Sequence, residues 1–377
     1  MDTYEEMGVH RVTNAIGHAT ILGGSILSIQ VLEAMVKAND YYVDMLELIE
    51  RTGKIIADIL GAGGGLVTSG GASALVLATA ACIAGKDPAK AAQLPETKGM
   101  KNEVIIQKGS RTVFDRCVTV AGGKLIEVAE EDFLENAINE KTAAIFSLRW
   151  AKGVPIEELV KIGKKRNIPI ILDAAGDTYP AERMKYYAKI GVDLVSQGAK
   201  YFDGPNSAGI LYGRGDLVEA AAFHSYTSFE RVNYPDYYPD HPTGCRPLGR
   251  AMKVDRQSVV GTVVALKRWF ERDHEAELEH CHKKAEHLAR ELNAIRGVTA
   301  RPSTSPWGER MGIPTCVRVA FDENTLRATT IAIARSLQAG NPSIWVRRFE
   351  DEIIMSTENL VDGDEQLIIE RLRELLS

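Results

Sequence analysis

Cysteine is scarce in this 377-residue sequence, which has five, scattered along the chain and never spaced as CxxC. This excludes the regular cysteine patterns of zinc ribbons and of disulfide-stapled secreted domains. The sequence also lacks an apolar run long enough to span a bilayer, a basic-then-apolar signal peptide, and an excess of basic residues, since its formal charge is −6. We therefore expect a cytoplasmic protein with free thiols that binds neither nucleic acid nor membranes.

A local group of metal-binding residue types is formed by His280, Cys281, His282 and His287. They occur within a charged helical pattern, ERDHEAELEHCHKKAEHLARELN, in which their side chains point in several directions. We interpret this segment as a solvated helix face and predict no metal site.

What is present is an ordinary globular composition, with 45% hydrophobic and 25% charged residues. The length predicts one large and one smaller domain. We place an N-terminal segment and helix at 1–55, a large domain at 56–264 and a small C-terminal domain at 265–377. Apolar residues at helical spacing predict helix over 28–60 and a long helix over about 258–293.

Short β-rich runs alternate with helical stretches between residues 64 and 215. This alternation predicts an α/β fold, a three-layer sandwich whose mostly parallel central sheet is covered by helices on both faces. Beyond the sheet, strands and helices mix, which predicts a smaller α+β domain. The strands expected in the large sheet are GLVTS, EVIIQ, KLIEVA, TAAIFSL, IPIILDAA and DLVSQGA.

Open α/β sheets bind ligands beyond the carboxyl ends of their strands, and three predicted strand ends carry unusual residues. In the first, GLVTSGGASALVLATAAC, a strand ends at 68–71 and a helix of small residues begins at Ala72 and Ser73. Glycines let an anion approach the backbone, and the free N–H groups of a helix N-terminus favour phosphate. The same residues also fit an ordinary tight turn.

The other two strand ends carry a carboxylate and a lysine. Asp173 ends the most apolar strand, where a buried charge needs a partner such as a protonated heterocyclic nitrogen. Alternatively it caps a helix or pairs with a basic side chain. Lys200 follows Gly198 and Ala199 and precedes a Gly-Pro turn; in a dry pocket its pKa would fall, which favours imine chemistry. The alternative is a surface lysine.

The order of these features is more specific than any one of them. In this order the chain resembles the pyridoxal-5′-phosphate (PLP) enzymes of aspartate aminotransferase fold: a turn suited to phosphate, an acidic strand end, a lysine 27 residues later and a Gly-Pro turn. Within them, the chain is similar to the selenocysteine synthase-like group that includes D-glucosaminate-6-phosphate ammonia lyase. The likeness spans nearly the whole chain and includes RVTNAIGHATILGGS, VIIQKGSRTVFD, ILDAAGD and GRAMKVDRQSVVG.

The resemblance implies a role for each matching residue. Lys200 would form the Schiff base with PLP, Asp173 would bind the pyridine nitrogen, and Ala175 would lie against the ring. Gly71, Ala72 and Ser73 would hold the phosphate. Gln197 is also placed among the cofactor ligands, although it stands where family members often have Ser, a departure that leaves its role open.

Substrate contacts are expected from arginines and from the N-terminal segment. An arginine at a strand end suits a carboxylate or phosphate, although a surface salt bridge is the usual alternative. His18 would donate a proton to a leaving group or be a loop histidine. The substrate-binding candidates are Asn14, His18, Thr20, Arg111, Arg149 and one of the neighbouring Arg347 and Arg348, of which we choose Arg348.

The resulting hypothesis is a carbon–nitrogen lyase, an ammonia lyase or dehydratase, whose small-molecule substrate is a β-hydroxy amino acid and which releases a 2-keto acid and ammonia by β-elimination. An aminotransferase, racemase or aldolase on the same scaffold, a selenium transferase and a non-catalytic protein of this fold are the alternatives. The resemblance further implies a homodimer or a multiple of one. The tyrosine-rich loop 225–247 would then lie at the interface, and Arg250 and Lys253 would reach the neighbour's cofactor phosphate.

Overall fold

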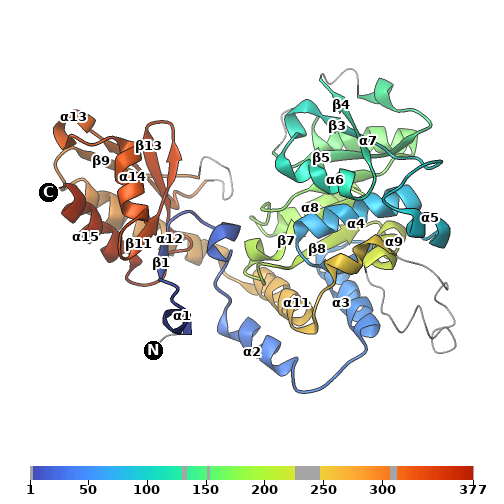
Figure 1. The fold of residues 1–377 in the computed structure, drawn as a ribbon, viewed down its shortest axis with the longest axis horizontal. Coiled ribbons are helices and arrows are strands. Elements are labelled where there is room, and N and C mark those ends of the chain that lie inside the picture. Colours follow the sequence, from blue (N-terminus) through green and yellow to red (C-terminus); the bar gives the residue numbers. More distant parts are fainter. Residues whose placement is uncertain (1–2, 130–133, 151–152, 226–246, 306–311, 377) are drawn as a thin grey trace. The chain divides into compact units, whose positions relative to one another are not determined.

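The computed structural model describes residues 3–129, 134–150, 153–225, 247–305 and 312–376 (Figure 1). The chain packs as two compact units: Leu27–Glu271, and Met1–Ile26 together with Arg272–Ser377. The domain division expected from the sequence stays a prediction. It treats residues 1–55 as one segment, whereas residues 1–26 pack with the smaller unit and residues 27–55 with the larger one.

The larger unit is built on a seven-stranded sheet with the order β2-β8-β7-β6-β5-β3-β4. Only β8 runs antiparallel to its neighbours, so the predicted mostly parallel sheet is confirmed. The six strands expected from the sequence all form. The strands are β2 (Gly64–Thr68), β3 (Glu103–Gln107), β4 (Lys124–Val128), β5 (Thr142–Leu148), β6 (Ile170–Asp173), β7 (Leu194–Gly198) and β8 (Gly209–Gly213).

Helices cover both faces of this sheet, and each face carries its own apolar core (Figure 1). Side chains alternate along each strand, so Val195 packs into one core and Leu194 into the other. One face is covered by α4 (Gly71–Ala84), α6 (Arg116–Val120) and α9 (Gly215–Ser225). The other is covered by α7 (Ile156–Arg166), α8 (Glu182–Ile190) and α11 (Arg256–Glu271). This is the predicted three-layer sandwich.

Two helices expected to be continuous are interrupted. The expected helix over 28–60 divides into α2 (Ile29–Lys37) and α3 (Met45–Leu60), and Asp44 caps α3 by accepting from the backbone N–H of Leu46 at 2.8 Å. The long helix near 258–293 likewise ends at Glu271, and Asp273 caps α12 (His274–Leu292) by accepting from the N–H of Ala276 at 3.0 Å. In both places an Asp side chain replaces the helical carbonyl as acceptor, which favours a new start over continuation.

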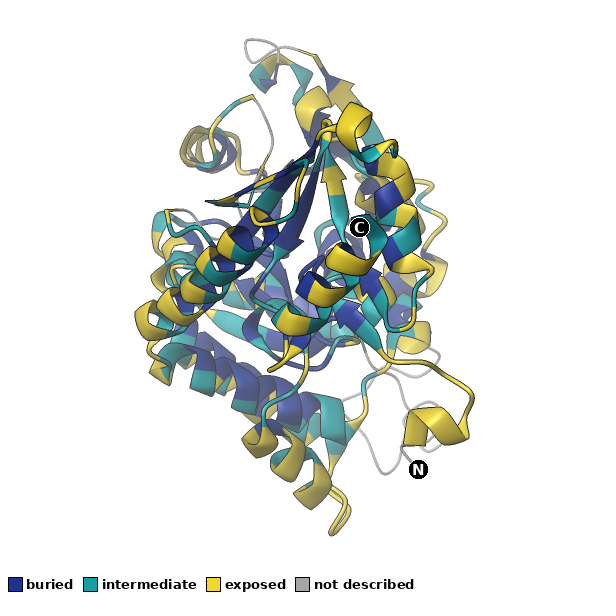
Figure 2. Cartoon of the chain, turned by 90° about the vertical axis from the view of Figure 1, so that its left-hand side faces the viewer, coloured by how far each residue is buried: buried dark blue, intermediate teal, exposed yellow. Residues whose placement is uncertain are grey.

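The smaller unit is an α+β structure, as predicted. Its four-stranded antiparallel sheet has the order β12-β13-β10-β9, and α12, α14 (Thr330–Gln338) and α15 (Asp364–Leu376) contribute to its core. Figure 2 shows exposed residues along the outer sides of the helices and buried residues on their inner sides. The strands of this sheet are β9 (Val298–Ser303), β10 (Cys316–Phe321), β12 (Arg347–Phe349) and β13 (Glu352–Ser356), and a separate parallel pair is formed by β1 (Val12–Asn14) and β11 (Ser343–Trp345).

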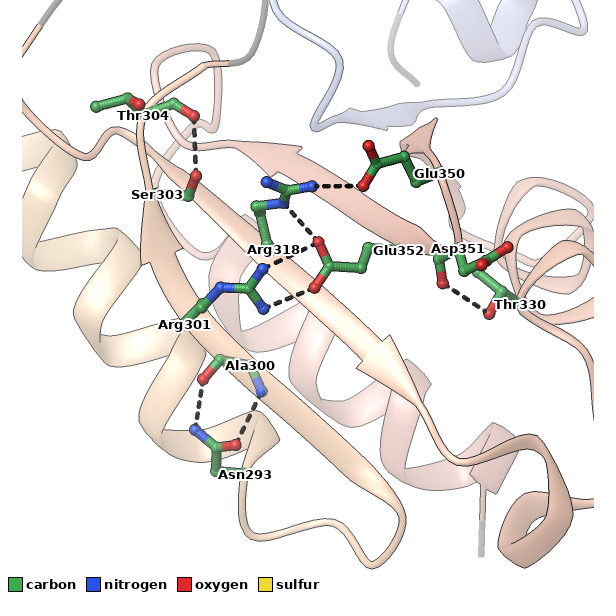
Figure 3. A network of polar contacts seen from close by, with 10 residues as sticks. All are labelled: Asn293, Ala300, Arg301, Ser303, Thr304, Arg318, Thr330, Glu350, Asp351 and Glu352. Carbon is green, nitrogen blue, oxygen red and sulfur yellow. Dashed lines mark hydrogen bonds and ion pairs between the residues drawn. The ribbon is translucent and has the colours of Figure 1, made fainter.

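One face of the small sheet carries an ion-pair network (Figure 3). Glu352 on β13 accepts from Arg301 on β9 at 2.6 Å and lies 2.5 Å from Nε of Arg318 on β10. Because β10 pairs with both other strands, the network ties three strands together through their side chains.

The histidine-rich segment lies on α12, where Cys281 is buried and the ring of His282 lies within hydrogen-bond distance of the Pro314 carbonyl, at 2.9 Å. Among the residues that the structure describes, no group of three His, Cys, Asp or Glu side chains is arranged to bind a metal. Over the same described ranges, no helix has the length and apolar character needed to cross a membrane.

Candidate active site

The first strand end forms a tight turn into a buried helix. Gly70 has φ = 103°, a conformation that residues with a side chain rarely adopt, and α4 begins at the next residue. The backbone N–H groups of Gly71, Ala72 and Ser73 occupy the first turn, where a helix has no internal acceptors for them. The Ser73 hydroxyl donates to the Ser69 carbonyl at 3.1 Å. These groups can therefore receive an anion, as the sequence predicted for phosphate.

The second strand end holds a buried carboxylate. Asp173 is 4% exposed, and Ala175 donates its backbone N–H to Oδ1 at 3.1 Å. Burial raises the pKa of Asp173 from its ordinary 3.8 to about 6, and the Ala175 N–H offsets this only in part. Within the described ranges no ion pair joins Asp173 to a basic side chain. A cationic group entering the site would therefore be stabilised by this carboxylate.

The third strand end carries the lysine. Lys200 lies in a 3₁₀ turn, Ala199–Phe202, directly after β7, and its Nζ is 5.1 Å from the centroid of the Tyr201 ring. The strand registers align all three ends: Thr68 and Gly198 both pair with Gly209 on β8, and Asp173 pairs with Ser196, two residues before Gly198 on β7. The fold therefore brings the predicted phosphate turn, the carboxylate and the lysine to one edge of the sheet.

Ser196 and Gln197 are neighbours on β7, and their side chains point to opposite faces of the sheet. The Ser196 hydroxyl donates to the Gly71 carbonyl at 2.9 Å, and Ser196 pairs with Asp173 on β6. Gln197 points to the opposite face, where its amide donates to the Asp177 carbonyl at 3.0 Å. The structure thus connects Ser196, which the sequence did not single out, to the phosphate turn, and it does not bring the Gln197 side chain there.

A cysteine also lies within electrostatic range of the carboxylate. Burial, and then the charge of Asp173, raises the pKa of the Cys117 thiol to about 11. Cys117 therefore stays protonated at neutral pH and adds no charge to the site.

The two arginines of the larger unit that were expected to bind substrate both form ion pairs. Arg111 lies 2.5 Å from both Asp115 and Glu127. Nε of Arg149 is 2.8 Å from the buried carboxylate of Asp177. The charge of each guanidinium is therefore already compensated by neighbouring acids.

The segment just before α11 is attached to the phosphate turn of the same chain. The Ser69 hydroxyl donates to the Met252 carbonyl at 2.8 Å, and the 3₁₀ turn Leu248–Met252 carries Arg250, whose side chain is exposed. Residues 226–246, which hold nearly all of the tyrosine-rich loop expected at a dimer interface, lie outside the described residues.

The remaining substrate candidates belong to the smaller unit. The Asn14 side chain closes a turn by accepting from the Ile16 N–H and donating to the Gly17 carbonyl, both at 3.1 Å. His18 is half-buried, and Thr20 and Arg348 are exposed. The neighbouring Arg347 is half-buried and lines a small cavity with Ala15, Ile16, Cys316 and Glu358, among others.

The fold and the strand ends define the class: an α/β protein with a glycine turn at a helix N-terminus, a buried acid and a lysine at one edge of its sheet. The chain matches aminotransferase class-V over residues 37–316 and belongs to this family. Its cofactor is PLP, as predicted.

Two curated relatives match almost the whole chain. A 5'-C-glycyluridine monooxygenase-decarboxylase from a Streptomyces species is 28% identical, covering 99% of this chain and 92% of the relative. A D-glucosaminate-6-phosphate ammonia lyase from Salmonella typhimurium is 27% identical, covering 99% and 97%. A solved structure of D-glucosaminate-6-phosphate ammonia-lyase superposes with a TM-score of 0.85 at 25% identity, covering 100% of this chain and 98% of the other. The predicted family and fold are confirmed.

The residues present fit this cofactor. Asp173 is a buried carboxylate that suits a protonated ring nitrogen, and the first turn of α4 offers N–H groups to a phosphate. Lys200, on the turn that follows β7, carries a primary amine of the kind with which PLP enzymes form their Schiff base.

Proposed function

We propose that this protein is a PLP-dependent carbon–nitrogen lyase that converts a β-hydroxy amino acid into a 2-keto acid and ammonia. The observation that carries the proposal is the full-length likeness to an ammonia lyase in both sequence and fold. The reaction is balanced without an oxidant or an acceptor: the β-hydroxyl leaves as water, and one water molecule then hydrolyses the resulting imine to the ketone and releases ammonia.

When bound, PLP supplies an electron sink for the carbanion formed at the substrate α-carbon. Asp173 would hold the proton on the ring nitrogen, and the N–H groups of Gly71, Ala72 and Ser73 would hold the phosphate. Lys200 Nζ would remove the α-proton as a general base. Ala175 remains the proposed contact to the ring face. The Gln197 side chain is not proposed as a cofactor contact, because its amide donates a hydrogen bond to the Asp177 carbonyl.

For the substrate acid group we propose Arg347 in place of Arg348, because Arg347 is half-buried whereas Arg348 is exposed. Asn14, His18 and Thr20 stay predictions as pocket-mouth residues. Arg111 is a weaker candidate, since two carboxylates neutralise it.

We also propose a homodimer. Helix α2 exposes Ile29, Leu32 and Val36 at helical spacing, whereas Val31 is buried. An apolar stripe of this kind favours association with another surface.

A second candidate activity is an oxygen-dependent decarboxylation, favoured by the likeness to the monooxygenase-decarboxylase. The test is to incubate PLP-loaded enzyme with a panel of β-hydroxy amino acids and to measure ammonia, oxygen uptake and carbon dioxide. A lyase releases ammonia without oxygen and without a keto-acid acceptor. Dependence on an acceptor would instead indicate an aminotransferase, and oxygen uptake with carbon dioxide release would indicate the second activity. Lys200→Ala is the control.

A further inference from the structure

The hydroxyl of Thr178 binds the backbone beside Lys200. Thr178 is 4% exposed, and its Oγ1 donates to the Tyr201 carbonyl at 2.8 Å. Thr178 follows Asp173 by five residues, and Tyr201 is the residue next to Lys200. This hydrogen bond therefore joins the segment that carries the buried acid to the turn that carries the lysine.

The ring of Tyr201 fits between two glycines. A Cβ atom added to Gly176 or to Gly198 would lie 3.3 Å from ring carbons of Tyr201, closer than ordinary van der Waals contact. The ring is therefore confined by the backbone of both segments, and Lys200 Nζ lies 5.1 Å from its centroid. Close packing of this kind leaves the lysine turn little freedom to rotate.

Helix α11 also binds Thr178, through its main chain. Trp269, 1% exposed and near the end of α11, donates its indole N–H to the Thr178 carbonyl at 2.9 Å. The main chain of Thr178 is thus bonded to α11 while its hydroxyl is bonded to the lysine turn.

The residue before Thr178 is fixed by an ion pair. The Asp177 carboxylate is 2.8 Å from Arg149 Nε and accepts a hydrogen bond from the Tyr187 hydroxyl, and its carbonyl accepts from Gln197 at 3.0 Å. Burial and the charge of Asp177 raise the pKa of Tyr187, which keeps this hydroxyl a donor. Arg149 and Gln197, both expected at the site from the sequence, thereby anchor this segment.

We infer that Thr178 is a positioning residue for Lys200, acting through the Tyr201 carbonyl while Trp269 and Asp177 hold Thr178 in place. This rests on the proposed role of Lys200 as the cofactor lysine, not on which reaction the enzyme catalyses. Catalytic groups must be held within a fraction of an ångström, and small displacements are costly in rate. Loss of the hydroxyl should therefore displace the Lys200 amine, which changes the spectrum and the affinity of the bound cofactor.

The test compares Thr178→Val, which keeps the shape but loses the hydroxyl, with Thr178→Ser, which keeps the hydroxyl. Thr52→Val is the matched control, because the buried Thr52 hydroxyl also donates to a carbonyl, that of Leu48 at 2.6 Å, on α3. Each PLP-loaded variant is measured for the pH midpoint of its visible band, its PLP dissociation constant and its unfolding midpoint.

We expect Thr178→Val to shift the spectral midpoint and to weaken PLP binding, Thr178→Ser to restore both, and Thr52→Val to change neither. Unchanged spectra in Thr178→Val, or equal impairment in the Val and Ser variants, would overturn the inference. If Thr178→Val does not fold, Trp269→Phe removes the other hydrogen bond and should shift the same midpoint; an unshifted midpoint overturns the inference. None of these readouts needs turnover, so a wrong reaction assignment leaves the test intact. A wrong lysine would be revealed separately by peptide mapping after borohydride reduction.

Discussion

Replacing Asp173 with asparagine should have opposite effects on the apoprotein and on the PLP-loaded enzyme. Burial raises the pKa of Asp173 from 3.8 to about 6, so the folded chain holds this proton more tightly than the unfolded chain does. At about 1.4 kcal/mol per pKa unit, the ionised carboxylate costs the folded apoprotein about 3 kcal/mol.

The sign depends on pH. Below pH 3.8 the carboxyl is protonated in both the folded and the unfolded chain, so it has no differential effect. As the pH rises to about 6, the unfolded chain loses its proton first and the free energy of unfolding falls. Above pH 6 the full penalty applies, and asparagine, which carries no charge, avoids it.

The assay is urea unfolding of the apoprotein from pH 4 to 8. Asp173→Asn should match the wild type at the acid end and exceed it by about 3 kcal/mol at pH 8. Asp115→Asn is the control: Asp115 is about as buried as Asp173 but is paired with Arg111, so its replacement should not raise the stability at pH 8. If apo Asp173→Asn is no more stable than the wild type at pH 8, the carboxylate already has a partner. In the loaded enzyme the same change should reduce kcat roughly hundredfold or more, because the amide cannot hold the ring nitrogen protonated.

Three further outcomes are expected. Borohydride reduction should fix PLP to Lys200 alone, and a labelled peptide without this residue would reject the assignment. Arg347→Ala should lower kcat/KM by roughly tenfold to a hundredfold through loss of a charge-assisted contact, while Arg348→Ala stays near the wild type. A larger loss in Arg348→Ala than in Arg347→Ala would instead assign the substrate acid group to Arg348. Leu32→Glu on the apolar stripe of α2 should convert a dimer to a monomer in light scattering, whereas Ile331→Glu, at a similarly exposed position, should not; a dimer unchanged by the first substitution would place the interface elsewhere.

Local sequence patterns were sufficient to predict six strands of the large sheet. The six expected strands form at the expected places; β5 and β6 are buried almost throughout, and burial on both faces requires continuous apolar residues. The helix breaks at Asp44 and Asp273 were missed, since the apolar periodicity continues across each cap while the Asp side chain ends the hydrogen-bond pattern.

The sequence by itself indicated the class of this protein, because a glycine turn, an acid and a lysine follow three strands in an order that resembles a known family, and the ends of parallel strands meet at one edge of a sheet. It could not decide which neighbouring side chains serve them. Ser196 faces the phosphate turn while Gln197 faces away, and Thr178 binds beside Lys200; these pairings join residues 20 to 125 positions apart. Such contacts depend on strand register and on the packing of helices against each face, and those are set only when distant parts of the chain come together.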